Sequence, residues 1–202
     1  MSNYWRFSRS AYYSVVAALP LLVGYEILVI LTQSRYWGIR NAADMWIRTF
    51  LMVFDLRAQH LTFVMIGIAF ALIPLAMTRS SGVKLKVHYF LLMFAEAFAY
   101  SLVLGVVLQS ILRLSGLAAG SPGNGALQNF ALSLGAGLFE EIIFRVILLN
   151  LLFLLLNFVL KNKVTAAVIS VLAASFLFSL SHYIGSMADS WQLYSFMFRW
   201  IA

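Results

Sequence analysis

The residues in this sequence best suited to chemistry are two adjacent glutamates and an arginine in the segment GLFEEIIFRVILLNLLFLLL, residues 137–156. Glu141 and Arg145 are four residues apart with the acidic residue first, which is the favourable order for an ion pair on one face of a helix. On an α-helix Glu140 points about 100° away from Glu141 and is left without that partner. We therefore predict that Glu141 and Arg145 orient each other, while Glu140 is available for proton transfer.

A histidine follows at a spacing that would bring it to the level of Glu140. Glu140 lies 21 residues before Lys161, and His182 lies 19 residues after Lys163. If the KNK segment between them turns an antiparallel helical hairpin, both side chains lie about 30 Å from the turn. A free carboxylate and an imidazole at one level predict general acid–base chemistry on a water molecule.

The elements that must position these residues are membrane helices. The 202 residues are 63% hydrophobic and 10% charged, and the mean hydropathy of +0.92 lies outside the range of soluble domains. A charged side chain inside a bilayer costs at least roughly 2.5 to 3.5 kcal/mol, so it normally faces the protein interior or a water-filled cavity and has a partner. The fold class predicted is an all-α, polytopic transmembrane helical bundle.

The rest of the composition excludes several classes of site. No cysteine is present, which excludes a disulfide framework, thiol catalysis and thiolate metal ligands. The net charge of +7 fits basic residues at the ends of membrane helices, where they hold lipid headgroups. No basic cluster is interleaved with exposed aromatic residues, so nucleic acid is not a predicted partner.

Hydropathy predicts about five or six membrane segments in a single integral membrane domain, residues 1–202, with N-terminal helices in 1–124 and a core in 125–202. The apolar stretches are residues 11–31, 61–77, 89–112, 127–160, 164–180 and the shorter final segment 191–202. Residues 33–60 mix charged and aromatic side chains and predict an amphipathic interfacial helix. The stretch 127–160 is longer than a membrane requires, which predicts a tilted helix, a kinked helix, or two helices broken near Gly135 and Gly137.

The two charged motifs also carry a family resemblance. EEIIFR matches the EExxxR motif, and FSLSH, residues 178–182, matches the FxxxH motif, of the CPBP family of intramembrane proteases (CAAX protease and bacteriocin-processing, also called Abi). The separation of 37 residues from Glu141 to Phe178 is also similar to that of the family, which includes the type II CAAX prenyl endopeptidases. The resemblance covers residues 125–202, whereas the first 120 residues are similar only in being hydrophobic.

The resemblance implies a role for each motif residue. Glu140 would activate the hydrolytic water as general base, and His182 would hold and polarise that water. Glu141 and Arg145 would form the orienting pair, and Phe178 would pack one turn beneath His182. The implied activity is an intramembrane endopeptidase acting on a peptide or lipidated protein tail in a bacterial plasma membrane. No cofactor is predicted, and water activation by glutamate is preferred to a metal site because Glu140 and Glu141 diverge on a helix, with a divalent metal kept as the alternative.

This sequence departs from the family at a later motif, a histidine followed four residues on by Asn or Asp, which is proposed to bind the oxyanion or, in a metalloprotease mechanism, a metal. His182 is the last histidine of the chain, and the others are His60 and His88. We therefore expect a fragment that lacks the last helices, or a natural degenerate homologue. In either case the 202 residues are expected to fold or bind without turnover.

Structural explanations of the same residues stay open. The Glu–Glu–Arg cluster is also typical of a helix-locking ion-pair network in a non-catalytic scaffold or bacteriocin-immunity-type protein. His182 is then an interfacial residue beside a polar connector. Glu26 and Glu96, inside predicted spans, favour buried hydrogen bonds over catalysis, and His60 and His88 are predicted to be interfacial.

Overall fold

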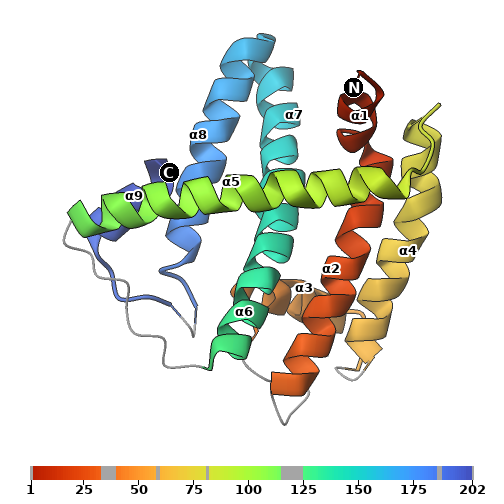
Figure 1. Cartoon of the computed structure of the whole chain (residues 1–202). Helices are drawn as coiled ribbons and strands as arrows, with labels where there is room; N and C mark the ends of the chain where they lie inside the picture. Colours follow the sequence, from red (N-terminus) through yellow and green to blue (C-terminus); the bar gives the residue numbers. More distant parts are fainter. Residues whose placement is uncertain are drawn as a thin grey trace. The chain divides into compact units, whose positions relative to one another are not determined.

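The computed structural model describes residues 2–32, 40–57, 60–80, 82–114, 125–185 and 188–201, and all regular structure in these ranges is helical (Figure 1). The all-α fold class is therefore confirmed. The helices are α1 (Ser2–Ser8), α2 (Ala11–Thr32), α3 (Ala42–Met52), α4 (Leu61–Arg79), α5 (Val87–Leu114), α6 (Ala126–Gly135), η2 (Ala136–Leu148), α7 (Leu149–Leu160), α8 (Lys163–Ser181) and α9 (Leu193–Ile201).

Five of these helical stretches are long and apolar enough to cross a membrane: Ala11–Thr32, Leu61–Arg79, Val87–Ser110, Ala126–Leu160 and Lys163–Ser181. They agree with the five long apolar stretches of the sequence, because a helix of about 20 residues spans the hydrocarbon core of a bilayer. The predicted sixth segment contains α9, which has only nine helical residues among those the structure describes. Many large apolar side chains on these stretches are exposed, as expected where lipid rather than protein surrounds a helix.

The helices fall into two compact units. The first contains α1, α2, α4 and α5, and the second contains α3, the end of α6, η2, α7, α8 and α9. The predicted single membrane domain and its division after residue 124 stay predictions. Every residue that the sequence singles out for catalysis lies in the second unit.

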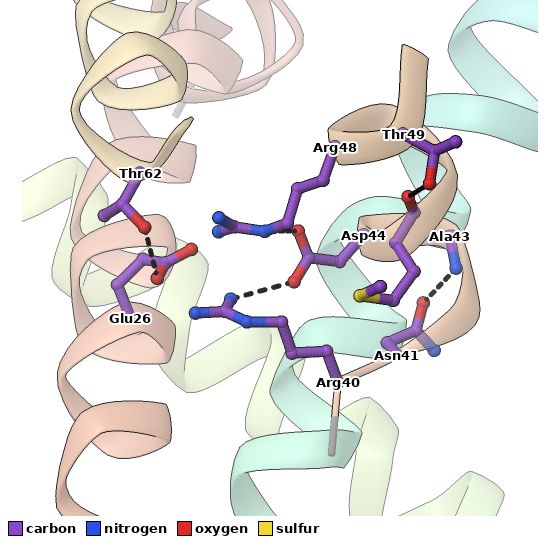
Figure 2. A network of polar contacts seen from close by, with 9 residues as sticks. Glu26, Arg40, Asn41, Ala43, Asp44, Arg48, Thr49 and Thr62 are labelled. Carbon is purple, nitrogen blue, oxygen red and sulfur yellow. Dashed lines mark hydrogen bonds and ion pairs between the residues drawn. The ribbon is translucent and has the colours of Figure 1, made fainter. Parts of the chain in front are cut away.

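The first unit is built on the packing of α2 against α4. Glu26 of α2 is buried, and its Oε2 accepts a hydrogen bond from Thr62 Oγ1 of α4 at 2.9 Å (Figure 2). Tyr13, which is also buried, donates its hydroxyl hydrogen to the carbonyl of Lys84 at 2.9 Å and accepts the N–H of Lys86 at 2.8 Å. These bonds place Glu26 in the structural role that the sequence favours for it.

Glu96 of α5 likewise has a structural partner. Its Oε2 accepts the hydroxyl hydrogen of Tyr4, from α1, at 2.6 Å. This hydrogen bond, with a contribution from burial, raises the pKa of Tyr4 to about 12. Because the folded state holds the tyrosine proton more tightly than an unfolded chain would, this contact stabilises the fold up to about pH 10, and its contribution is lost as the pH rises toward 12.

The second unit is organised by the helical hairpin of α7 and α8, which lie side by side in Figure 1 and are joined by the predicted KNK turn. Lys161 ends α7 in the left-handed conformation, with φ of 52°. Asn162 then caps α8, and its side chain accepts hydrogen bonds from the N–H groups of Val164 and Thr165. The hairpin brings the η2 end of the long helix alongside α8, as the sequence analysis requires.

The short helix α9 packs on α8 through polar contacts to the main chain. Ser179 Oγ donates to the carbonyl of Phe196 at 2.7 Å, and Trp200 Nε1 donates to the carbonyl of Leu172 at 3.2 Å. Both donors are satisfied by carbonyls of the neighbouring helix, which fixes α9 against α8. Arg199 and Trp200 are thereby held close to the hairpin.

The predicted interfacial helix appears as α3, although residues 33–39 and 58–59 of the predicted segment lie outside the described residues. Its charged side faces the interior: Asp44 is fully buried, and one of its oxygens accepts from Arg48 Nε at 2.7 Å while the other accepts from Arg40 at 2.9 Å (Figure 2). Its aromatic side is exposed at Trp46 and Phe50. In a soluble protein the apolar side of an amphipathic helix is buried and the charged side is exposed. The opposite arrangement of α3 fits a surface covered by lipid.

Candidate active site

The segment that carries Glu140, Glu141 and Arg145 is not an ordinary α-helix. Helical structure continues from Ala126 to Leu160, so the predicted alternative of two helices broken near Gly135 and Gly137 is wrong. The main chain instead changes at Ala136 into the π-helix η2, whose N–H groups bond to carbonyls five residues earlier. Such wider turns inside α-helices are rare and occur frequently at functional sites.

At the junction of η2 and α7, the side chain of Asn150 donates hydrogen bonds to two main-chain carbonyls. The N–H of Leu149 still bonds to the carbonyl of Phe144, five residues back. The next carbonyl along the chain is that of Arg145. The side-chain amide of Asn150 donates to this carbonyl at 3.3 Å and to that of Val146 at 2.8 Å.

Replacing Asn150 by Leu is expected to lower the stability of the protein by about 1 to 3 kcal/mol, because a backbone acceptor loses its partner. The measurement is thermal or denaturant unfolding in detergent, followed by circular dichroism. Asn157→Leu is the matched control, since Asn157 is on the same helix and its side chain makes no hydrogen bond within the described part of the chain. Equal unfolding midpoints for the two variants would show that the amide of Asn150 does not support the π-helix.

A cavity of about 810 Å³ brings the charged residues of η2 together with α8 and α9. Its lining includes Glu140, Glu141, Arg145 and Phe178, four of the five residues predicted for the site, together with Arg199 and Trp200. Most of the remaining lining is apolar. A Cβ built on Gly137, another lining residue, would meet no atom within 4 Å, so this glycine leaves space on the same helix as Glu140.

Glu140 has a partner that the sequence analysis does not foresee. Its Oε1 accepts a hydrogen bond from Asn41 Nδ2 at 2.8 Å, whereas the α-helical spacing predicted no partner for this carboxylate. Asn41 is the residue that caps α3. The polar contact of Glu140 is therefore made with a segment 99 positions away in the chain.

Glu141 and Arg145 form the ion pair that their spacing predicts. Arg145 donates to Glu141 Oε1, and the exposed fractions of the two side chains are 72% for Arg145 and 46% for Glu141. Both partners lie on η2, so this pair does not tie two helices together. A charged pair on a membrane helix is expected to face a cavity rather than lipid, which agrees with its place in the cavity lining.

His182 does not line the cavity but contacts a residue that does. Its ring contacts that of Phe178 at a centroid distance of 4.9 Å, edge to face, and Phe178 does line the cavity. The Nδ1 atom of His182 lies 3.0 Å from the carbonyl of Phe178. A carbonyl only accepts, so this contact is a hydrogen bond in the tautomer that carries the hydrogen on Nδ1, and Nε2 is the acceptor in that tautomer.

Glu140 and His182 are not joined directly in the structure. Among the described residues no hydrogen bond connects them, and the cavity lining contains Glu140 but not His182. No group of three or more His, Cys, Asp or Glu side chains arranged as metal ligands occurs in the described ranges. The catalytic roles predicted for Glu140 and His182, and the supporting roles predicted for the other three residues, stay predictions.

Three residues of this region are not among those predicted from the sequence. Asn41 is recognisable as a helix cap, since it precedes the first turn of α3, but nothing in its position points to Glu140. Arg199 and Trp200 reach the cavity through the packing of α9 on α8. Arg199 donates to Asp189 Oδ2 at 2.7 Å and to the hydroxyl oxygen of Tyr183 at 3.2 Å.

Comparison with known proteins agrees with the motifs. Residues 122–202 match the family model described as Type II CAAX prenyl endopeptidase Rce1-like. No curated protein and no solved structure matches the chain. The matched residues include η2, α7, α8 and α9, and therefore both motifs and all the cavity-lining residues named above. The sequence resemblance is thus confirmed over residues 122–202, which are similar to the Rce1-like type II CAAX prenyl endopeptidases.

Proposed function

We propose that this protein is an intramembrane endopeptidase in which Glu140 activates a water molecule for attack on a peptide bond. The observation that carries the proposal is the cavity lined by Glu140, Glu141 and Phe178 within the residues that match the family. A carboxylate beside an apolar cavity has the geometry that a general base needs, since a substrate carbonyl and a water can approach it together. Bacterial plasma membrane is the proposed location, following the family resemblance.

The proposed reaction uses the side chains in distinct roles. Glu140 takes a proton from water, the water oxygen bonds to the scissile carbonyl carbon, and the carbonyl oxygen becomes an oxyanion. Collapse of this intermediate breaks the C–N bond, and the proton held by Glu140 passes to the leaving amine. His182 accepts a hydrogen bond from the water through Nε2, and the Glu141–Arg145 pair orients the segment that carries Glu140.

The oxyanion requires a donor, and Arg199 is the residue that we propose for it. No side chain within the 202 residues matches the later histidine motif of the family, and the proposal of turnover departs here from the expectation drawn from the sequence. Arg199 is a cationic residue of the same cavity lining, and its guanidinium group is held by Asp189 and Tyr183. A fixed cation near a developing negative charge stabilises the transition state more than the substrate.

Arg199→Gln is expected to lower kcat for peptide cleavage about 100-fold with little change in KM, the effect typical of losing one oxyanion donor. Arg199→Lys retains the positive charge but not the planar guanidinium group. Its kcat is expected to lie between those of Arg199→Gln and wild type. The rates are measured with purified protein in liposomes. Wild-type kcat in Arg199→Gln would remove this residue from the mechanism.

The proposed substrate is a peptide or lipidated protein tail that enters the cavity from the membrane. The mostly apolar lining favours hydrophobic segments, and the charged groups at η2 provide the polar end of the site. The test is cleavage by the 202-residue protein in liposomes of a peptide library prepared with and without a lipid anchor, with products identified by mass spectrometry. Cleavage that depends on Glu140 supports the proposal, and no cleavage of any member contradicts it.

A non-catalytic scaffold or bacteriocin-immunity-type protein is the second candidate, and one contact favours it. The hydrogen bond from Asn41 to Glu140 joins α3 to η2, which is a helix-locking role for the carboxylate. The exposed Glu141–Arg145 pair does not support this scaffold function, because both partners belong to one helix. If wild type cleaves nothing and Glu140 variants lose only thermal stability, this second function is the correct one.

A further inference from the structure

The side chain of Asn41 makes two hydrogen bonds, one as an acceptor and one as a donor. Its Oδ1 accepts the N–H of Ala43 at 2.8 Å, which caps the first turn of α3 (Figure 2). Its Nδ2 donates to Glu140 Oε1, also at 2.8 Å. One side chain therefore connects the beginning of α3 to the carboxylate that we propose as general base.

The cap fixes which end of the amide faces Glu140. A backbone N–H is always a donor, so the atom that Asn41 turns toward Ala43 must be the oxygen. The nitrogen then faces Glu140 and can only donate. One oxygen of the carboxylate is held in place by this bond, while Oε2 accepts no hydrogen bond from the described residues.

The helix that carries Asn41 is itself held firmly in the second unit. Asp44, one turn into α3, is fully buried with its carboxylate between Arg40 and Arg48. On the exposed side, the Trp46 ring lies 6.2 Å from that of Phe144, a residue of η2. The two ion pairs are made within residues 40–48 and order α3 and its cap, whereas the aromatic contact packs α3 on η2.

The aromatic contact of α3 also leads toward His182. Phe144 contacts Phe178 at a centroid distance of 5.1 Å, and Phe178 contacts His182 at 4.9 Å. Edge-to-face aromatic pairs of this kind contribute beyond their buried area. The same short helix thus contacts Glu140 through an amide and is linked to His182 through three successive ring contacts.

We propose that α3 is a positioning element of the active site and that Asn41 is the positioning residue for Glu140. The inference rests on the proposed function, but it concerns residues outside 122–202, the part that matches the family. Asn41 holds one carboxylate oxygen so that the other is presented to water. Without the amide, Glu140 is free to rotate, and the near-attack geometry is lost.

The test separates the cap from the contact to Glu140. Asn41→Ser and Asn41→Asp both keep a good helix cap, but neither places a neutral amide donor on Glu140. We expect each to lower kcat about 10- to 100-fold with KM little changed, since small misplacements of catalytic groups have effects of this size. Asn41→Asp additionally sets a second carboxylate beside Glu140, so the acid limb of its pH–rate profile is expected to move to higher pH, whereas that of Asn41→Ser stays in place.

A second measurement does not depend on catalysis. In a double-mutant cycle with Asn41→Ser and Glu140→Ala, the decreases in unfolding temperature of the single variants are expected to add up to more than that of the double variant. The matched cycle with Glu141→Ala is expected to be additive, because Glu141 bonds to Arg145 and not to Asn41.

The outcomes distinguish the two proposals. Coupling in the first cycle together with no cleavage by wild type would overturn the endopeptidase function and leave Asn41 as a structural partner of Glu140. Wild-type kcat and pH profile in both Asn41→Ser and Asn41→Asp, or equal additivity in both cycles, would overturn the positioning role of Asn41.

Discussion

Replacing Glu140 by Gln is expected to reduce kcat for peptide cleavage by roughly 10² to 10⁴, the range for losing a general base. Gln has nearly the same size as Glu, and its carbonyl oxygen still accepts the hydrogen bond from Asn41, so the fold is expected to survive. The amide does not take a proton from water, and the first chemical step therefore fails. Initial rates in liposomes, with product quantified by mass spectrometry, measure the loss.

The adjacent glutamate provides the comparison for this experiment. Glu141→Gln weakens the pair with Arg145 but leaves the carboxylate of Glu140 and its contact to Asn41 in place. Its decrease in kcat is expected to be clearly smaller than that of Glu140→Gln. Equal decreases in the two variants, or wild-type rates in Glu140→Gln, would mean that Glu140 is not the base.

Asp44→Ala is expected to destabilise the protein by about 3 to 5 kcal/mol, the cost of breaking a buried ion pair by removing one partner. The carboxylate of Asp44 is shared by Arg40 and Arg48, whose side chains are each only 4% exposed. Its loss leaves two buried guanidinium groups without the carboxylate that they share. The measurement is the free energy of unfolding in detergent micelles, from denaturant titration.

A substitution on the same helix shows whether the burial of Asp44 matters. Thr49 is exposed on α3, and within the described ranges its side chain bonds to the carbonyl of Met45, one turn earlier. Thr49→Ala is expected to change the free energy of unfolding by about 0.5 kcal/mol or less. If Asp44→Ala has no larger effect than Thr49→Ala, the buried charges of α3 do not hold it in place.

The membrane helices follow directly from the sequence because their apolar stretches are long and end in polar residues. The stretch predicted as residues 11–31 is α2, Ala11–Thr32, and the stretch predicted as 164–180 is α8, Lys163–Ser181. The KNK turn is also predictable, since Asn162 is a favourable helix cap. Hydropathy and capping are local properties of the chain, and no tertiary contact is needed to recognise them.

The candidate site is less predictable because it depends on contacts between distant residues. The pairing of Glu141 with Arg145 is local and was foreseen, whereas the partner of Glu140 is 99 positions away. The π-helix was missed because the change in hydrogen-bond spacing leaves no trace in the pattern of apolar residues. The inward-facing charges of α3 were missed because amphipathic patterns do not show which face meets lipid.

The π-helix has a consequence for how the long helix responds to insertions and deletions. A π-helical turn accommodates more residues over the same length than an α-helical one, so η2 absorbs extra sequence without moving α7 along its axis. It thereby sets an angular offset between the residues that face the cavity and the residues of α7 that pack on α8. A single-residue deletion within η2 would rotate Glu140 away from its cavity while leaving the KNK hairpin intact. The number of residues in this segment, and not only its motif, therefore determines which side chains face the cavity.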